Sequence, residues 1–387
     1  MRVLHWYANF LSGGGVANAV RSLAMSQARL GAEVTIASAR ASDPPMYEPM
    51  VGDARVPLLE WEPRWRVRFH GFHLRGLPFA ALRRFRGFKP DIVHVHGGFN
   101  ADNLWVPSIF DCAVVFSPHG SYHREVFRKG RAAAKALYLR LESRLLHHRV
   151  NAFHSLSPIE SDQINRLVPG CRVYCVPQGP GIQAHLSMAT EGLAGDDDGI
   201  RLVCVGRLDV FTKGLDILME AFAKAVGRLN GNPATLTLVG PEWKGGMAWL
   251  QRRARKLGIA GRTVFTGPLS GAEVASVLCR SHIYVSLPRH DAFSLSVAEA
   301  LLAGKPAILS EAAGPASYPE IAALPHIRVV PLSINETADA IVDFAPRLGQ
   351  LRHAADQCRE RIREFFSWER IGGAHLAMYE KIRAGTL

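Results

Sequence analysis

Two carboxylates are associated with one predicted helix in the carboxy-terminal half of the sequence. Asp291 comes just before the helix start, where Ser294 can serve as N-cap, and Glu299 lies inside the helix. Leucines and alanines after Ser294 recur at helical spacing, and Gly304 with Pro306 ends the pattern. Glu299 therefore lies about 7.5 Å along the helix axis from the N-cap, given a rise of about 1.5 Å per residue.

The N-terminus of this helix has the features of an anion site. A buried strand is predicted at 282–287, directly before the helix, so free N–H groups and the helix dipole face outward at the end of the strand. A diphosphate at the helix tip, a ribose beside Glu299 and a sugar beside Asp291 would fit this spacing. Taken alone, the segment is equally typical of an ordinary strand–helix unit with a surface acid.

Two cations flank a second strand-to-helix turn. The strand predicted at 201–205 ends in Gly206-Arg207, and Lys213-Gly214 opens the next helix. Arginine can bind a phosphate through its bidentate fork and lysine as a point charge, so Arg207 and Lys213 are candidates to hold a diphosphate. The alternative is that both are solvated surface cations.

The amino-terminal half offers a glycine turn and one histidine. Gly13, Gly14 and Gly15 follow the first predicted strand, where they let the backbone approach a diphosphate closely. A dinucleotide-binding fold is disfavoured, because Asn18 stands where that fingerprint needs Gly or Ala. His119 ends a strand between Pro118 and Gly120, which predicts an exposed side chain with a fixed direction. His94 is interpreted as structural and His96 as facing a cleft.

Together these motifs resemble the donor-site signatures of retaining GT-B glycosyltransferases of the family 4 type, the glycosyl transferases group 1. The resemblance covers nearly the whole chain and rests on the following segments: Gly206-Arg207-Leu208 with Lys213-Gly214, Asp291-x7-Glu299, Ala303-Gly304-Lys305-Pro306, Gly13-Gly14-Gly15 and Pro118-His119-Gly120. The family usually carries Glu where this chain has Asp291; the shorter side chain keeps the charge.

The resemblance implies a hexosyltransferase-type enzyme. It would move a sugar, with retention, from a UDP- or GDP-linked donor to the hydroxyl of a lipid-linked or glycan acceptor, in bacterial polysaccharide or glycolipid biosynthesis. It assigns catalysis to His119, Arg207, Lys213 and Asp291, and donor binding to Gly14, Gly15, Arg207, Lys213, Leu269, Phe293, Ser294, Leu295 and Glu299. The nucleotide base would be contacted near Gly240 and Leu269. No cofactor and no metal are expected, and same-face attack is favoured because no carboxylate is an evident nucleophile.

Two rival functions fit parts of this pattern. A sugar-nucleotide epimerase on the same fold would release no glycoside and need no acceptor. A non-catalytic protein that binds sugar nucleotides or glycans is the second rival. The joint presence of Arg207, Lys213 and Glu299 argues against it, because folding alone requires none of the three.

Alternating strand and helix signals predict an α/β chain of two doubly wound Rossmann-like domains, which the GT-B resemblance places face to face across a cleft. We expect an amino-terminal acceptor-side domain at 1–180, a linker rich in Gly, Pro and Asp at 181–199, and a donor domain at 200–367. An amphipathic helix in the last segment, 368–387, would return to the first domain. Ligands would bind beyond the carboxyl ends of the strands.

The charge of the chain is uneven. Residues 1–180 hold 23 Lys and Arg against 13 Asp and Glu, a net +10 of the total +12. Arginines interleave with Trp and Phe from Arg64 to Lys89, and a second basic run spans Arg124 to Arg149. Basic residues among aromatic ones suit an anionic membrane surface, and a solvated basic face is the alternative. No nucleic-acid module accompanies them.

The remaining composition favours a cytoplasmic protein, which would be peripheral on the inner face of the membrane if the basic stretch binds there. No run of about 18 apolar residues is present, so no transmembrane helix is expected. The first residues lack the layout of a signal peptide and are typical of a first strand. Six scattered cysteines without paired spacing favour reduced thiols over a zinc site.

Overall fold

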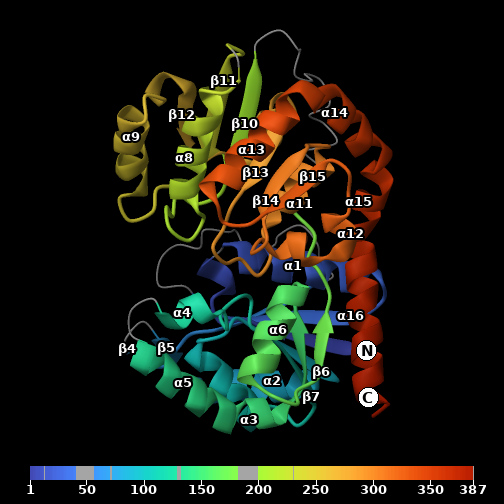
Figure 1. Cartoon of the computed structure of the whole chain (residues 1–387). Helices are drawn as coiled ribbons and strands as arrows, with labels where there is room; N and C mark the ends of the chain where they lie inside the picture. Colours follow the sequence, from blue (N-terminus) through green and yellow to red (C-terminus); the bar gives the residue numbers. More distant parts are fainter. Residues whose placement is uncertain are drawn as a thin grey trace. The chain divides into compact units, whose positions relative to one another are not determined.

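The computed structural model describes residues 1–12, 14–40, 56–69, 72–128, 132–181, 199–229 and 231–386. Gly13 and nearly all of the expected linker lie outside these residues. The chain divides into two compact units, one formed by Met1–Gly179 with Ser367–Leu387 and the other by Pro180–Phe366 (Figure 1). We call them unit 1 and unit 2.

Unit 1 contains a seven-stranded parallel sheet with the order β3-β2-β1-β6-β7-β8-β9. A short antiparallel hairpin, β4-β5, stands apart from it. The strands are β1 (Arg2–Trp6), β2 (Glu33–Ala39), β3 (Leu58–Trp61), β4 (Arg66–Phe69), β5 (Phe72–Arg75), β6 (Ile92–His96), β7 (Ala113–Ser117), β8 (Val150–Ser155) and β9 (Val173–Cys175).

Helices on both faces of this sheet bury its apolar side chains. They are α1 (Gly15–Arg29), α2 (Phe79–Phe88), α3 (Val106–Ile109), α4 (Arg124–Arg128), α5 (Ala132–Leu145), α6 (Pro158–Leu167) and α16 (Trp368–Arg383). One core cluster centres on Trp6, Trp61 and Phe85, whose rings pack within 6 Å of one another. A second lies on the other face, where α1 and α16 cover the sheet.

Helix α16 comes last in the chain yet packs along α1 (Figure 1). Gly372 allows this close approach, because a Cβ there would lie 2.2 Å from Ser26 Oγ. The Ser26 hydroxyl in turn donates a hydrogen bond to the carbonyl of Trp368. His375, Met378 and Tyr379 on the same helix are buried inside unit 1. The chain end therefore completes the core of unit 1.

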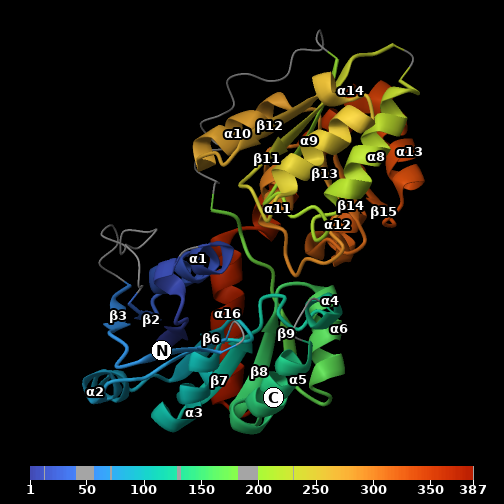
Figure 2. The same cartoon turned by 90° about the vertical axis from the view of Figure 1, so that its left-hand side faces the viewer.

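Unit 2 contains a six-stranded parallel sheet with the order β12-β11-β10-β13-β14-β15. The strands are β10 (Ile200–Val205), β11 (Ala234–Val239), β12 (Thr263–Gly267), β13 (Ile283–Ser286), β14 (Ala307–Ser310) and β15 (Ile327–Val330). The helices are α8 (Leu215–Val226), α9 (Gly246–Lys256), α10 (Gly271–Arg280), α11 (Leu295–Leu302), α12 (Pro319–Ala322), α13 (Ile334–Phe344), α14 (Leu348–Gln357) and α15 (Arg359–Phe365). Helices α8 and α13 lie side by side (Figure 2) and enclose the main core cluster with the strands.

The strands and helices expected from sequence patterns are present with small shifts at their ends, and two doubly wound parallel sheets confirm the predicted class. The predictions omitted β3, the β4-β5 hairpin and the short helices α3 and α4. Among the described residues, no helix is long and apolar enough to cross a membrane. All six cysteines are free thiols.

Candidate active site

In unit 2, the predicted donor residues gather at the carboxyl edge of the sheet, where the strand order reverses between β10 and β13. Such switch points open a crevice between the loops that leave the two strands. The loop after β10 and the loop after β13 touch closely. Gly214 has φ +63°, and a Cβ there would lie 1.9 Å from the carbonyl oxygen of Leu287. Only glycine permits this approach.

Arg289 fastens these two loops together. Its guanidinium makes two hydrogen bonds to the carboxylate of Asp216, at 2.8 and 2.7 Å, and one to the carbonyl of Phe211 at 2.7 Å. The guanidinium also lies 4.2 Å from the ring centre of Phe211, and the Arg289 N–H donates to Thr212 O at 2.9 Å. Sequence reasoning missed Arg289, although its position two residues before Asp291 was a usable signal.

With the two loops joined by Arg289, a cation and an acid of the predicted site are in contact. Lys213 Nζ donates to Asp291 Oδ2 at 2.6 Å, and their side chains are 24% and 16% exposed. Arg207 is exposed and stacks on Trp243, with its guanidinium carbon 4.3 Å from the ring centre. The loops thus carry an anchored ion pair and an accessible arginine that is oriented by an aromatic face.

Helix α11 begins at the same edge. Ser294 occupies its N-cap position, as predicted, but its side chain makes no capping bond and contacts Ser296 Oγ at 3.3 Å instead. The first N–H groups of α11 are thus left without a side-chain cap. Leu295 is half-buried. Phe293 is buried against Phe366, with ring centres 6.1 Å apart, so its side chain supports the loop from inside. A donor contact at Phe293 would therefore be made mainly by its backbone, and its assignment to the donor site stays a prediction.

Glu299 lies within α11 as a half-buried carboxylate. Within the described part of the chain, no hydrogen bond or ion pair reaches this carboxylate. Burial raises the pKa of Glu299 to about 7. A carboxylate that is desolvated yet unpartnered is poised to accept hydrogen bonds from ligand hydroxyls.

Two further positions lie on neighbouring strands of unit 2. Gly240 follows β11 with φ +142°, and a Cβ there would lie 2.0 Å from the carbonyl oxygen of Gly206. This approach packs the loop after β11 against the Gly206-Arg207 turn. Leu269 is half-buried between β12 and α10, one strand further along the same edge. The predicted base-contacting positions therefore lie on the β11–β12 side of Arg207.

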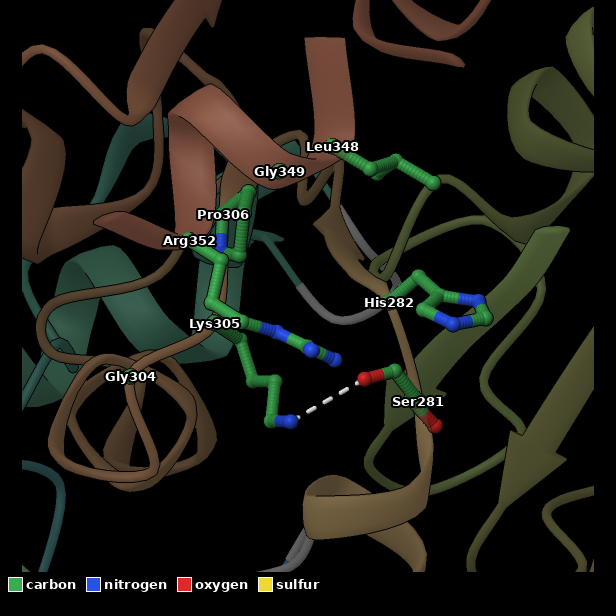
Figure 3. Close-up of a pocket in the computed structure, with 8 residues that line it drawn as sticks. All are labelled: Ser281, His282, Gly304, Lys305, Pro306, Leu348, Gly349 and Arg352. Carbon is green, nitrogen blue, oxygen red and sulfur yellow. Dashed lines mark hydrogen bonds between the residues drawn. The ribbon is translucent and has the colours of Figure 1, made fainter. Parts of the chain in front are cut away.

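Lys305, part of the Ala-Gly-Lys-Pro segment, has a structural role at the opposite edge of the sheet. Its buried ammonium donates to the carbonyls of Cys279 and Ser281, at 2.8 and 3.0 Å, at the end of α10. Figure 3 shows the ammonium directed at Ser281 in a pocket that Arg352 also lines. Desolvation lowers the pKa of Lys305 to about 8. It satisfies helix-end carbonyls rather than contacting a donor.

In unit 1, the strand order reverses between β1 and β6. Gly14, with φ +94°, and Gly15 are exposed where the turn after β1 enters α1. His119 follows β7, with φ +53°, and Gly120 follows with φ +77°. Two successive left-handed residues make a sharp turn, which costs free energy at a non-glycine position.

A buried carboxylate holds this turn. Glu160, at the start of α6, accepts the N–H of Gly120 at 2.5 Å and the N–H of Leu156 at 2.7 Å. The side chain of His119 is half-buried, and its Nε2 lies 3.0 Å from Nδ1 of His96. Desolvation lowers the pKa of His119 to about 4, so the ring is neutral at pH 7. His119 is therefore fixed in direction, as predicted, but is less exposed than expected.

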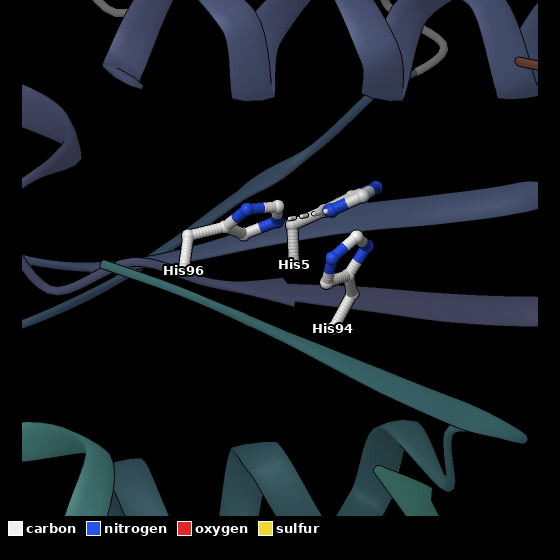
Figure 4. Close-up of side chains that lie close together, drawn as sticks. All are labelled: His5, His94 and His96. Carbon is white, nitrogen blue, oxygen red and sulfur yellow. Dashed lines mark hydrogen bonds between the residues drawn. The ribbon is translucent and has the colours of Figure 1, made fainter. Parts of the chain in front are cut away.

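His96 is buried, and it lines a small pocket of unit 1 together with His119 and His154. It is buried beside His5 and His94, which come from the neighbouring strands β1 and β6 (Figure 4). Nitrogen atoms of these three rings lie within 4.8 Å of one another, a spacing that could hold a metal ion. Each ring nitrogen, however, already has a protein hydrogen-bond partner. This arrangement fits a hydrogen-bonded network better than a set of open ligands.

Some side chains of the basic stretch Arg64–Lys89 are buried. Arg75 is buried and paired with Asp102, and Phe85 lies in the core. Exposed apolar side chains in this stretch include Trp65 and Phe79. In the second basic run, Leu137, Leu141 and Leu145 form an exposed stripe along α5, at 65%, 44% and 44% exposure.

Comparisons with known proteins confirm the family resemblance. The model of Glycosyltransferase Family 4 matches residues 13–180, and that of Glycosyl transferases group 1 matches residues 199–345. The chain belongs to the family 4, group 1 glycosyltransferases. The matched ranges contain every residue assigned to the site, from Gly14 to Glu299.

Individual relatives are distant. An MMP alpha-(1->4)-mannosyltransferase of Mycolicibacterium hassiacum is 25% identical over 52% of this chain, and the match spans 47% of that protein. A GDP-mannose-dependent alpha-mannosyltransferase of Mycobacterium tuberculosis is 27% identical, covering 80% of this chain and 78% of the relative. The solved structure of Anabaena HepE with UDP and glucose superposes with a TM-score of 0.71 at 15% identity, covering 98% of this chain and 100% of that one. The fold of this glycosyltransferase is GT-B.

Proposed function

We propose that this glycosyltransferase transfers a hexose, with retention, from a UDP- or GDP-linked donor to an acceptor hydroxyl. Unit 2 would hold the nucleotide: Glu299 accepts hydrogen bonds from the ribose, and the N–H groups of α11 receive the diphosphate. Arg207 and Lys213 balance the charge that develops on the leaving diphosphate. Asp291 and His119 would contact the sugar, as the family resemblance implies.

The observation that carries this proposal is the state of Glu299. Its carboxylate is partly buried on α11, has no protein partner among the described residues, and has a pKa raised to about 7. Leaving such a group unpaired is unfavourable, so a ligand that supplies hydroxyl donors gains free energy there. A ribose offers two adjacent hydroxyls, and the neighbouring helix tip suits the attached phosphates.

The cations of unit 2 also support transfer without a metal. Lys213 is held by Asp291 at 2.6 Å, and Arg207 is oriented by Trp243. Two positioned cations at a helix N-terminus can stabilise a departing diphosphate without a metal ion. We expect activity to persist in excess chelator. Complete loss that magnesium or manganese restores would contradict this part of the proposal.

A nucleotide-release assay tests the function directly. The full-length protein is incubated with UDP- and GDP-hexoses, with and without a lipid extract as acceptor source, and products are resolved by mass spectrometry. Acceptor-dependent release of nucleotide with a new glycoside supports transfer. An epimerase would give no glycoside, and a binding protein would release no nucleotide beyond the uncatalysed rate.

We further propose a membrane-proximal acceptor, with α5 in place of the Arg64–Lys89 stretch as the main contact. The stripe of Leu137, Leu141 and Leu145 is flanked by Arg140 and Arg144, which are exposed on the same helix. An apolar helical stripe beside cations suits an anionic bilayer, and each cation near it contributes about 1 kcal/mol.

Vesicle co-sedimentation at low and high salt tests this contact. Binding to anionic vesicles that is lost in high salt and weakened by Leu141→Glu would support it. The control is Leu332→Glu, because Leu332 is an exposed leucine that lies in unit 2. Equal partition to neutral and anionic vesicles, or none to either, would leave a solvated face and favour a soluble acceptor.

A further inference from the structure

His119 is the half-buried end of a buried chain of hydrogen bonds in unit 1. Its Nε2 lies 3.0 Å from His96 Nδ1, and His96 Nε2 lies 2.9 Å from His5 Nδ1. His5 Nε2 lies 2.8 Å from the side-chain oxygen of Gln27. Figure 4 shows the link between His5 and His96. His119 is thereby connected to helix α1 through two imidazoles.

The chain continues from Gln27 on α1 to the neighbouring helix α16 and back to the sheet. Gln27 Nε2 lies 3.3 Å from the hydroxyl of Tyr379 on α16, and that hydroxyl lies 2.6 Å from His94 Nδ1. His94 Nε2 and His154 Nδ1 both lie 2.6 Å from Ser117 Oγ. The last member, His154 Nε2, lies 2.9 Å from the backbone carbonyl of Val176.

The carbonyl at the far end decides the direction of several links. A carbonyl oxygen can only accept, so His154 Nε2 carries the proton and His154 Nδ1 is a bare acceptor in the neutral ring. Ser117 must then donate its single proton to His154, and His94 must donate from Nε2 to Ser117. His94 Nδ1 is consequently bare, and it must accept the proton of Tyr379.

The hydrogen bonds between Tyr379 and His119 have equally fixed directions. With its proton committed to His94, the Tyr379 oxygen accepts from the amide nitrogen of Gln27, which turns the amide oxygen toward His5. His5 then donates from Nε2 and accepts at Nδ1, and His96 donates from Nε2 and accepts at Nδ1. His119 must donate from Nε2. The amide orientation of Gln27 in the structure is the one that this sequence of donors requires.

The imidazole rings of this chain are neutral because they are buried. Desolvation lowers the pKa of His5 and His119 to about 4 and the pKa of His94, His96 and His154 well below 6.5. A neutral imidazole has one donor and one acceptor nitrogen, so each link determines the next. No described residue forms a hydrogen bond with Nδ1 of His119.

We propose that this chain fixes His119 as the Nε2–H tautomer and presents its bare Nδ1 to the substrate, with Gln27, His5 and His96 as positioning residues. The group that meets His119 is then a hydrogen-bond donor such as a sugar hydroxyl, and His119 is neither a general acid nor a cationic contact. This role in sugar binding rests on the proposed function. The Nε2–H tautomer of His119 is independent of the proposed function.

The tautomer can be measured without any substrate. Nitrogen NMR of the full-length protein labelled with ¹⁵N-histidine distinguishes a protonated from a bare ring nitrogen, and the spectrum of His119→Asn assigns the His119 signals. We expect the Nε2–H form in the free protein at pH 7. A dominant Nδ1–H form in the wild type would overturn the proposal, whether or not the protein transfers sugar.

Two matched substitutions test the anchor. Gln27→Met keeps the size and removes the acceptor for His5, so we expect mixed His119 tautomers and a turnover lowered about tenfold, the value of one hydrogen bond of ordinary strength. Gln27→Glu keeps an acceptor toward His5 in either protonation state, so it should retain the wild-type tautomer and most of the turnover.

An unchanged His119 tautomer and unchanged turnover in Gln27→Met would remove Gln27 and the chain behind it from this role. If Gln27→Met fails to fold in a thermal unfolding assay, Tyr379→Phe serves instead. It deletes one hydroxyl, frees the Gln27 amide to turn over, and should again mix the tautomers. A single wild-type tautomer in Tyr379→Phe would likewise contradict the proposal.

Discussion

The polar groups at the candidate site differ between the two units of this glycosyltransferase. Unit 1 buries neutral imidazoles that bond to one another in a line, with His119 at its end. Unit 2 places charged groups at its edge, where Lys213 pairs with Asp291 and Glu299 stands unpartnered among the described residues. A neutral chain is sensitive to proton direction and to acid, whereas a charged cluster is sensitive to deletion of single charges.

Acid gives the largest expected difference between the units. Burial lowers the pKa of His5, His119 and His375 from 6.5 to about 4. The unfolded chain therefore binds more protons than the folded one between these values. Each such histidine removes about 1.4 kcal/mol of stability per pH unit as the pH falls through this window.

Unit 2 is partly protected against loss of stability in acid. It also contains His326, whose pKa is lowered to about 4, but the pKa of Glu299 is raised from 4.5 to about 7. That raised value favours the folded state as the pH falls from 7 toward 4.5, which offsets His326. We expect hydrogen exchange read by mass spectrometry at pH 7 and pH 5 to show unit 1 opening first. Equal loss of protection in both units would contradict the comparison.

Deleting one charge in unit 2 should abolish most activity. We expect Lys213→Ala and Arg207→Ala each to lower turnover about 100-fold or more, the usual cost of losing a stabiliser of developing charge. Lys224→Ala, on the exposed end of α8, is the matched control and should have little effect. Near-normal turnover in both site variants, measured by nucleotide release, would disprove the donor-site assignment.

Removing the Arg289 side chain, which joins the two loops, should have a smaller effect on turnover. Arg289→Ala removes the two bonds to Asp216 that hold the loop carrying Asp291 against the loop carrying Lys213. We expect turnover to fall about tenfold through misplacement of the ion pair, with folding retained. Arg228→Ala removes a comparable pair with Asp339 on the surface and serves as control. Equal turnover of the two variants would leave Arg289 without a role in the site.

Glu299→Gln should act on binding of the nucleotide itself. An amide accepts hydroxyl hydrogen bonds less well than a carboxylate, so we expect about tenfold weaker binding of free UDP or GDP by calorimetry. Because the pKa of Glu299 is about 7, wild-type affinity should fall as the pH drops below 7, and the variant should lack this dependence. Asp291→Asn should instead reduce turnover more than nucleotide binding. Unchanged affinity in Glu299→Gln would remove Glu299 from the nucleoside site.

Much of the fold and of the unit 2 site was predictable from sequence, because its signals are local. Strand and helix periodicity places Arg207, Lys213, Asp291 and Glu299 after strands or in a following helix, and the reversal of strand order then gathers them at one edge. The close approach of Gly214 to Leu287 could not be foreseen, since it depends on how two loops far apart in sequence meet.

The histidine chain of unit 1 could not be predicted in the same way. Its members come from β1, α1, β6, β7, β8 and α16. Their spacing in the sequence does not predict that they are linked by hydrogen bonds. One partial signal was available. His94 and His96 are two residues apart on β6 and must share a face, so their side chains are expected to be neighbours. Desolvation and register, which decide the rest, are properties of the folded sheet.

The late position of α16 also affects biosynthesis. Tyr379, which sets the orientation of Gln27, emerges from the ribosome only after all of unit 2 has been translated. At about 5–20 residues per second, the stretch from 180 to 366 takes about 10–40 s to synthesise. During that interval the nascent amino-terminal sheet exposes the surface that α16 later covers. Unit 1 is therefore translated first, yet its hydrogen-bond chain can be completed only after unit 2 has been translated.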